Sequence, residues 1–236
     1  MVKIPRKIIA IIPARGGSKR IKNKNLVMLG GKPLLAHSIL QAREARGVSR
    51  VIVSTEDKRI AATARKFGAE VVKRPKALAG DQASSEEALL HVLEELKKQE
   101  GYEPDLVVFL QCTSPMREPK DIEQAVKTLL AQKADSLFSA CRNHGLIWEK
   151  RAEKLFSLNY DFRRRLREQK MPSQYRENGS IYVFRPEILR KFRNRLGGKI
   201  AVYEMDFLSS FQIDEPIDIK LIELLQPLVN NKYHER

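Results

Sequence analysis

The feature that most constrains this chain is the alternation of short apolar runs with helix-length segments along its first two-thirds. The runs have strand length and little polar alternation, as strands covered on both faces would have. They occupy residues 7–12, 51–54, 70–72, 106–110 and 136–140, and the segments between them predict helices over 33–45, 57–67, a stretch after 84, and 119–132. Strand–helix–strand repetition with short links requires parallel strands and crossover helices. The predicted fold class is therefore α/β: a three-layer, Rossmann-like fold with a mostly parallel sheet.

The third helix carries its own start signal. Ser84 to Glu87 read as a capping box, in which a Ser and a Glu side chain satisfy each other's free backbone donors.

The alternation ends after Cys141. Residues 142–174 contain the only Trp, short β-like pieces and a basic cluster, which predicts an arm projecting from the sheet, most commonly used for dimerisation. Regular elements resume at 180–184 and 200–205, with a last helix at 216–225. Because no repeat or Gly/Ser linker divides the sequence, residues 1–236 are predicted to form a single domain, with 142–174 as a projecting arm for dimerisation or substrate binding.

Composition narrows the possible partners and the location. No run of 18 apolar residues is present, so no membrane partner is predicted. Two cysteines in 236 residues suit a reducing cytoplasm. The net charge of +15 favours a polyanionic partner. Aromatic residues make up only 7% and do not interleave with the basic runs, which argues against nucleic acid as that partner. A basic nucleotide- or nucleic-acid-binding protein without enzymatic activity remains the alternative, and its binding would depend steeply on salt.

The loop after the first strand is suited to a nucleoside triphosphate. Ligands on such sheets bind outside the carboxyl ends of the strands, and this loop spans residues 13–25. Gly16 and Gly17 are expected to adopt positive φ and let backbone N–H groups approach a ligand. Within the loop, Arg15, Lys19 and Lys24 supply cations, and Ser18 and Asn25 supply neutral donors. It is neither a Walker A loop nor a G-x-G-x-x-G dinucleotide loop.

Six motifs in order give the chain a family resemblance. They are residues 12–19 with Lys24-Asn25, then Ser54-Thr55-Glu56-Asp57 with Arg74-Pro75, 81–85, 110–115, 174–182 and 211–214. With these motifs the chain resembles the acylneuraminate cytidylyltransferases over about residues 7–225. The resemblance implies a nucleotidyltransferase fold and transfer of CMP from CTP to the anomeric hydroxyl of an acylneuraminate or related nonulosonic acid, releasing pyrophosphate. It also implies Mg²⁺ as cofactor and a homodimer.

The resemblance assigns roles position by position. Arg15, Lys24 and Asp214 are the implied catalytic residues, with Asp214 also the implied metal ligand. The implied nucleotide-binding residues are Ala14, Arg15, Gly16, Ser18, Lys24, Asn25, Arg74, Ala83 and Ser85. Of these, Arg15, Ser18, Lys24 and Asn25 match phosphate-binding positions, and Arg74 and Ser85 match the cytosine pocket. The implied sugar-binding residues are Gln111, Tyr175, Arg176, Asn178 and Tyr182.

Several of these residues have a purely structural alternative. Ser85 and Asp214 could each cap a helix, Gln111 could satisfy a strand end, and Tyr182 could belong to the core. No general base is identifiable, because none of the four His lies in a matched motif.

The chain departs from the family pattern at three positions. Gln212 stands where many members have a first metal aspartate, and a neutral amide is a poor Mg²⁺ ligand. Asp218, one helical turn beyond Asp214, is a candidate helper. Cys112 replaces a common proline, and Glu168 lies where an arginine often precedes Leu-Pro. The nearest rival is a cytidylyltransferase for the eight-carbon acid Kdo, whose family has Pro where this chain has Asn25.

Overall fold

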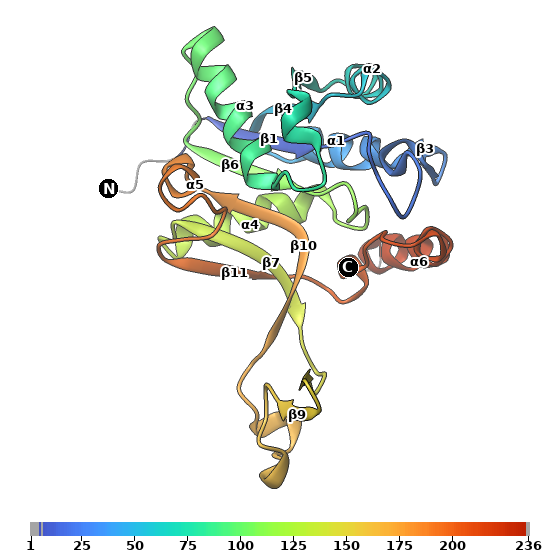
Figure 1. The fold of residues 1–236 in the computed structure, drawn as a ribbon, viewed down its shortest axis with the longest axis vertical. Coiled ribbons are helices and arrows are strands. Elements are labelled where there is room, and N and C mark those ends of the chain that lie inside the picture. Colours follow the sequence, from blue (N-terminus) through green and yellow to red (C-terminus); the bar gives the residue numbers. More distant parts are fainter. Residues whose placement is uncertain (1–4, 6, 235–236) are drawn as a thin grey trace.

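The computed structural model describes residues 5 and 7–234, so residues 1–4, 6 and 235–236 of the predicted single domain lie outside it. Its centre is a seven-stranded sheet in the order β11-β7-β10-β6-β1-β4-β5 (Figure 1). The strands are β1 Ile8–Pro13, β4 Val48–Thr55, β5 Glu70–Lys73, β6 Leu106–Leu110, β7 Ser136–Arg142, β10 Tyr175–Phe184 and β11 Ile200–Glu204. All neighbours pair in parallel except β10, which runs antiparallel to both β6 and β7. The predicted mostly parallel α/β sheet is confirmed.

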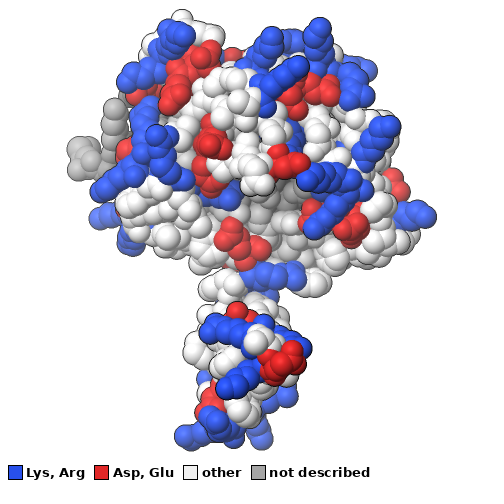
Figure 2. All heavy atoms as spheres, viewed as in Figure 1, with Lys and Arg blue, Asp and Glu red and all other residues white. Residues whose placement is uncertain are grey.

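An arm extends from the ends of β7 and β10. Its hairpin consists of β8 (Trp148–Arg151) and β9 (Lys154–Ser157), which pair antiparallel. Figure 1 shows the arm projecting well beyond the sheet and helices, as predicted for residues 142–174. Figure 2 shows basic side chains spread over one face of the body and again along the arm, with acidic side chains among them. No described helix is long and apolar enough to cross a membrane.

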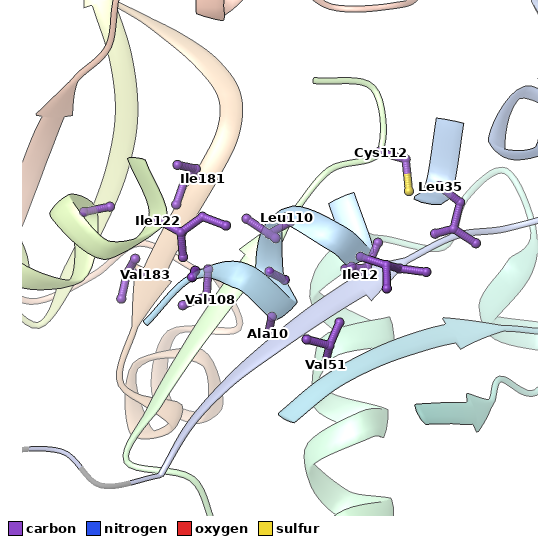
Figure 3. Close-up of a cluster of buried hydrophobic side chains, with 14 of the residues drawn as sticks. Ala10, Ile12, Leu35, Val51, Val108, Leu110, Cys112, Ile122, Ile181 and Val183 are labelled. Atoms are coloured by element: carbon purple, nitrogen blue, oxygen red, sulfur yellow. The ribbon is translucent and has the colours of Figure 1, made fainter. Parts of the chain in front are cut away.

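Helices cover both faces of the sheet, because side chains of successive strand residues point to opposite faces. On β1, Ala10 and Ile12 belong to one buried cluster with α1 side chains, whereas Ile9 and Ile11 belong to another with α3 side chains. Figure 3 shows side chains of the first cluster, where Ile12 of β1, Leu110 of β6 and Ile181 of β10 lie among side chains from the helices of this face, such as Leu35 and Ile122. The helices are α1 Leu34–Glu44, α2 Lys58–Lys66, α3 Ser85–Glu100, α4 Pro119–Ala131, α5 Pro186–Phe192 and α6 Pro216–His234. The predicted three layers are confirmed.

The structure differs from the sequence-based prediction mainly after β7. β10 begins at Tyr175, five residues before the predicted start, because its first three residues are exposed and carry no apolar pattern. Its direction was not predicted: the arm, and not a crossover helix, connects it to β7. α5 was not predicted at all, and α6 continues past residue 225 to His234 with Pro227 inside it. A small hairpin, β2 (Met28–Leu29) with β3 (Lys32–Pro33), was also missed.

The N-terminus of α2 provides a stability prediction. Asp57 caps this helix, and its Oδ1 accepts the backbone N–H groups of Arg59 and Ile60 at 2.7 and 3.2 Å. The side-chain hydrogen bond from Arg59, together with these backbone donors, holds the pKa of Asp57 below its ordinary value. Asp57→Ala is expected to reduce the free energy of unfolding by about 1 kcal/mol at pH 7, as measured by urea denaturation.

The pH dependence of that loss tests its origin. Because the folded pKa of Asp57 is lowered, its electrostatic contribution is fully present above the unfolded value of about 3.9 and is lost as the pH falls through the folded pKa. The difference in the free energy of unfolding between the wild type and Asp57→Ala should therefore become smaller in acid. Asp57→Asn keeps a capping oxygen without the charge, so it should retain most of the stability at pH 7. A difference in unfolding free energy that stays constant into strong acid would contradict this account.

Candidate active site at the carboxyl ends of the strands

The loop after β1 is fastened to its neighbours by backbone and amide hydrogen bonds. Ala14 N donates to Ser54 O of β4 at 3.0 Å, and Asn25 Nδ2 donates to Arg15 O at 2.9 Å, which closes the loop on itself. The left-handed residue of the loop is Asn23, with φ of 55°. The expectation of positive φ at Gly16 and Gly17 was wrong, since neither adopts it. Glycine suits position 16 for another reason: a Cβ there would lie 2.8 Å from Asp57 Oδ2.

Carboxylates engage the groups of this loop that were assigned to phosphates. Arg15 Nη1 donates to Asp81 Oδ1 and to Gly80 O, both at 3.1 Å, and Lys19 Nζ lies 2.7 Å from Asp81 Oδ2. The hydrogen bond from Lys19, with that from Arg15, lowers the pKa of Asp81, which therefore stays ionised. These contacts identify the loop as a place where negative charge is stabilised.

A second set of contacts continues this pattern. Gly16 N donates to Glu56 Oε1 at 2.7 Å. Lys24 Nζ donates to Ile213 O at 2.8 Å and to Asp214 Oδ1 at 3.2 Å. Lys24 thereby joins the first loop of the chain to the segment before α6. Ser18 is partly buried, and its backbone N–H donates within the loop to Gly16 O.

The residues matched to a cytosine pocket lie on adjoining segments. Arg74 is buried and donates from Nη2 to Ser54 O at 2.8 Å and from Nε to Ser54 Oγ at 3.1 Å. Burial lowers the pKa of Arg74. Ala83 N donates to Gly80 O within the same turn that carries Asp81.

The start of α3 settles which serine caps the helix. Ser84 Oγ accepts Glu87 N at 3.2 Å, and Ser84 N donates to Glu87 Oε2 at 2.8 Å. The predicted capping box is confirmed, and its cap is Ser84. The hydroxyl of Ser85, the next residue, is therefore not needed as the cap.

One cavity of about 320 Å³ collects predicted residues from four distant segments, and we call it the strand-end cavity. It is lined by Pro13, Asn25, Ser85, Phe109, Gln111, Cys112, Thr113, Gln212 and Asp214. Asn25, Ser85, Gln111 and Asp214 were each singled out from the sequence. Burial raises the pKa of Cys112 to about 12, so its thiol stays protonated and is a poor nucleophile.

A second cavity, also of about 320 Å³, shares Gln212 with the first, and we call it the phenylalanine cavity. Its lining is Arg176, Glu177, Asn178, Phe207, Ser210, Phe211 and Gln212. The Arg176 guanidinium lies 5.6 Å from the centre of the Phe207 ring. The side chain of Asn178 is buried and already bonded, accepting from Ser139 Oγ at 2.6 Å and Ser180 N at 3.1 Å. Two predicted sugar-binding residues thus line this cavity, one of them with little free bonding capacity.

Two side-chain amides, those of Gln111 and Gln212, lie next to Gly179. Gly179 has φ of 61°, and a Cβ there would lie 2.6 Å from both Gln111 Oε1 and Gln212 Nε2. Gln212 Nε2 also donates to Asn178 O. The glycine therefore allows both amides to approach the backbone of β10.

The two predicted tyrosines do not join the cavities. Tyr182 is buried, its ring stacks on Phe109 with 5.4 Å between centres, and its hydroxyl donates to Glu177. Burial raises the pKa of Tyr182 above its usual value. Tyr175 lies at the base of the arm, opposite Arg142 of β7. Tyr182 thus matches the core alternative, and neither tyrosine lines the two cavities as described.

The donor set beside Asp214 consists of oxygens. Asp214 is half-exposed in the strand-end cavity, and the amides of Gln111 and Gln212 line the same space. Oxygen donors suit Mg²⁺, which typically takes one or two carboxylates and completes its shell with phosphate and water. Among the described residues no group of three or more His, Cys, Asp or Glu could hold a metal. Asp218, the candidate helper, accepts the backbone N–H groups of Asp214 and Glu215 with its Oδ2 at the start of α6.

Sequence reasoning missed four residues of this region. Glu56 lies within a quoted motif, and that position was the one available signal for its role. Phe211 opens the quoted 211–214 motif, whereas Phe207 gave no signal, because it comes from an irregular segment whose neighbours are set by the tertiary fold. Arg117 follows the 110–115 motif and is buried beneath it.

Comparisons with known proteins agree with one another. A family model described as Cytidylyltransferase matches residues 9–235. N-acylneuraminate cytidylyltransferase A of Danio rerio is 36% identical over 223 residues, which are 92% of this chain and 50% of that protein. The chain therefore spans about half the length of that relative. CMP-N,N'-diacetyllegionaminic acid synthase of Legionella pneumophila is 32% identical over 232 residues, covering 94% of this chain and 97% of that protein. Among solved structures, a CMP:2-keto-3-deoxy-manno-octonic acid synthetase complexed with CTP superposes with a TM-score of 0.70 at 20% identity, covering 94% of this chain and 99% of that one.

Proposed function

The chain belongs to the cytidylyltransferase family, and from that membership we propose that it transfers CMP from CTP to the anomeric hydroxyl of an acylneuraminate or related nonulosonic acid, releasing pyrophosphate. The observation that carries the proposal is the strand-end cavity. Asn25, Ser85, Gln111 and Asp214 come from four separate segments and line the same space, beside a loop whose cations attract negative charge.

The chemistry is an in-line displacement at the α-phosphorus. A bond forms between the anomeric oxygen and the α-phosphorus, the bond from that phosphorus to the α,β-bridging oxygen breaks, and the hydroxyl proton passes to solvent. Phosphoryl transfer needs little covalent help, so positioning and charge neutralisation supply most of the acceleration. A reaction that depends on positioning and charge neutralisation suits a site rich in cations and amides and poor in nucleophiles.

Arg15 and Lys24 neutralise the phosphates in this scheme. Both are paired with carboxylates, so the triphosphate has to compete with Asp81 for Arg15 and with Asp214 for Lys24. These carboxylates are about half-exposed, and exposed ion pairs are worth only about 0–1 kcal/mol. The exchange is therefore inexpensive, and the pairs keep both cations at the cavity until CTP arrives.

Mg²⁺ fits this scheme with Asp214 as its carboxylate ligand. When bound, the ion supplies charge neutralisation on the phosphate oxygens. Gln212 contributes no charge, so the protein offers one carboxylate at this place. Lys24, which bonds to Asp214, holds that carboxylate toward the cavity.

The acceptor is proposed to lie toward the phenylalanine cavity. Arg176 offers a cation for the sugar carboxylate, and the two phenylalanines offer apolar surface for acyl groups. Gln212, which lines both cavities, and Gln111, which lines the strand-end cavity, have amide groups for sugar hydroxyls.

The test is pyrophosphate release from CTP and Mg²⁺ with a panel of acceptors, followed by mass identification of the CMP product. The panel contains N-acetylneuraminic acid and N,N'-diacetyllegionaminic acid, suggested by the names of the relatives, with Kdo as the rival acceptor. UTP in place of CTP is the nucleotide control. Release with a nine-carbon acid and not with Kdo is expected. Release with none of the acceptors would contradict the proposed function, and release with Kdo alone would favour the rival.

We further propose that the protein works in the cytoplasm as a homodimer joined through the arm. Cys112 and Cys141 are buried, free thiols, as suits a reducing compartment. The arm exposes a series of large apolar side chains, of a kind that marks interaction surfaces: Ile147, Trp148, Leu155, Phe156, Leu158, Phe162 and Leu166.

The arm proposal gives a prediction for oligomeric state. The double variant Leu155→Glu, Leu158→Glu places two charges on the apolar surface of the arm and is expected to convert a dimer into monomers. The matched control is Ile217→Glu, Leu224→Glu on α6, where Leu224 is 73% exposed against 64% for Leu155. Sedimentation velocity at micromolar concentration distinguishes the two. A wild-type protein that sediments as a monomer, or a control that dissociates equally, would contradict the proposal.

A further inference from the structure

Arg117 is a buried cation beneath the strand-end cavity. It is 2% exposed, and it lies between the 110–115 motif and α4. Burial lowers the pKa of Arg117 to about 10, so it still carries its charge at neutral pH. No carboxylate of the described chain lies within ion-pair distance of it. A charge buried in this way is costly unless hydrogen bonds compensate it.

The two terminal nitrogens of the guanidinium are compensated by oxygens from three separate segments, while its Nε has no hydrogen-bond partner among the described residues. Nη1 donates to Ser114 O at 2.8 Å, to Gln111 O at 3.1 Å and to Ser180 O at 3.2 Å. Nη2 donates to Ser38 Oγ of α1 at 2.5 Å and to Gln111 O at 2.7 Å. The planar fork of an arginine holds several acceptors in fixed directions, which a lysine ammonium does not do.

Two of these acceptors, the carbonyls of Gln111 and Ser180, belong to the two segments that lie close together at Gly179. Gln111 follows β6, and Ser180 follows Gly179 in β10. Arg117 binds the carbonyls of Gln111 and Ser180 through the same nitrogen. The side chain of Gln111 lies against Gly179 itself. One guanidinium thus links the backbone at Gln111 to the backbone of β10 next to Gly179, against which the Gln111 side chain lies.

We propose that Arg117 is a positioning residue that fixes Gln111 against the Gly179 turn and thereby orients the acceptor sugar. This inference rests on the proposed function, in which Gln111 faces the sugar. Arg117 does not line the cavity and contacts neither substrate. Its effect reaches the reaction through the Gln111 and Ser180 carbonyls.

Arg117→Lys and Ser38→Ala test the role without removing the whole network. Lysine keeps the positive charge but loses the planar set of hydrogen-bond donors of the guanidinium. Ser38→Ala removes only the hydroxyl bonded to Nη2. The matched control is Ser114→Ala: Ser114 is as fully buried as Ser38, but its hydroxyl has no hydrogen-bond partner. In steady-state assays, Arg117→Lys should lower kcat/KM for the acceptor about 100-fold, the size of effect expected for a misplacement of about 1 Å.

The split between substrates separates positioning from general damage. Ser38→Ala is expected to lower kcat/KM for the acceptor about tenfold, because Arg117 loses one hydrogen bond that holds it in place, while KM for CTP stays unchanged. Ser114→Ala should match the wild type in both constants. Equal losses for CTP and acceptor, or equal losses in Ser38→Ala and Ser114→Ala, would overturn the inference.

A second readout does not require turnover. The ¹⁵N side-chain amide resonance of Gln111, assigned by its loss in Gln111→Ala, should shift in Arg117→Lys and in Ser38→Ala but not in Ser114→Ala. An unmoved resonance in both test variants overturns the positioning role. If the wild type transfers CMP to no acceptor, the proposed function fails, while this spectrum still decides whether Arg117 positions Gln111.

Discussion

Arg15→Ala is expected to lower kcat/KM for CTP by about 10²–10³, which corresponds to about 2.7–4 kcal/mol of lost transition-state stabilisation. Arg15 is held by the Gly80 carbonyl and the Asp81 carboxylate, both 3.1 Å from Nη1, in the loop whose Asn25 lines the strand-end cavity. Negative charge develops on the departing pyrophosphate, and a preorganised cation next to it stabilises that charge without reorganisation. Removing the cation should therefore affect kcat as well as binding.

The size of this effect is measured by steady-state kinetics, with calorimetry of CTP binding as the second readout. Arg190→Ala is the matched control, because Arg190 is also in an ion pair, with Glu103 at 3.3 Å, and its side chain is 43% exposed against 36% for Arg15. Arg15→Lys keeps the charge and should recover part of the loss. Wild-type kinetics in Arg15→Ala would remove Arg15 from the site.

Gly179→Ala is expected to reduce kcat/KM about 100-fold and to destabilise the fold by about 1–2 kcal/mol. The new Cβ would lie 2.6 Å from Gln111 Oε1 and from Gln212 Nε2, so both amides must move. The stability cost has a separate source: a φ of 61° is strained for any residue with a Cβ. Displacement of reacting or orienting groups by about 1 Å is sufficient for the kinetic loss.

Gly101→Ala distinguishes collision from strain. Gly101 has φ of 62°, nearly that of Gly179, and a Cβ there would have nothing within 4 Å. This control should lose similar stability in urea denaturation and keep the wild-type kcat/KM. If Gly179→Ala loses no more activity than Gly101→Ala, the two amides do not depend on the glycine, and their role in the site is wrong.

Much of the fold could be predicted because buried parallel strands are visible as apolar runs. β1 and β6 are buried along nearly their whole lengths, and both appeared in the sequence with bounds close to those observed. β10 did not appear in full, since its exposed first residues depend for their pairing on β7, more than thirty positions away. The direction of β10 was equally hidden, because it depends on the path of the arm.

The candidate site was predicted as a set of residues and not as a set of contacts. The cations of the first loop were visible, but their carboxylate partners were not: Lys24 and Asp214 are 190 positions apart. Asn25, Ser85, Gln111 and Asp214 do line one cavity. Tyr182 shows the limit of a period-two pattern, because alternation with apolar neighbours suits a buried tyrosine as well as a ligand-binding one.

The continuity of β10 restricts how this chain can vary in length. One strand of ten residues passes from the base of the arm, through the turn at Gly179, to the middle of the sheet. The pairing of β10 with β7 is already irregular between Glu177 and Tyr182, so a residue added or deleted between Tyr175 and Gly179 would break that pairing or move the Gly179 turn away from Gln111 and Gln212. Ala152, in the hairpin turn between β8 and β9 at φ of 51°, is under no such restriction. Natural insertions, fused tags and circular permutation should therefore be tolerated at the far end of the hairpin and rejected along β10.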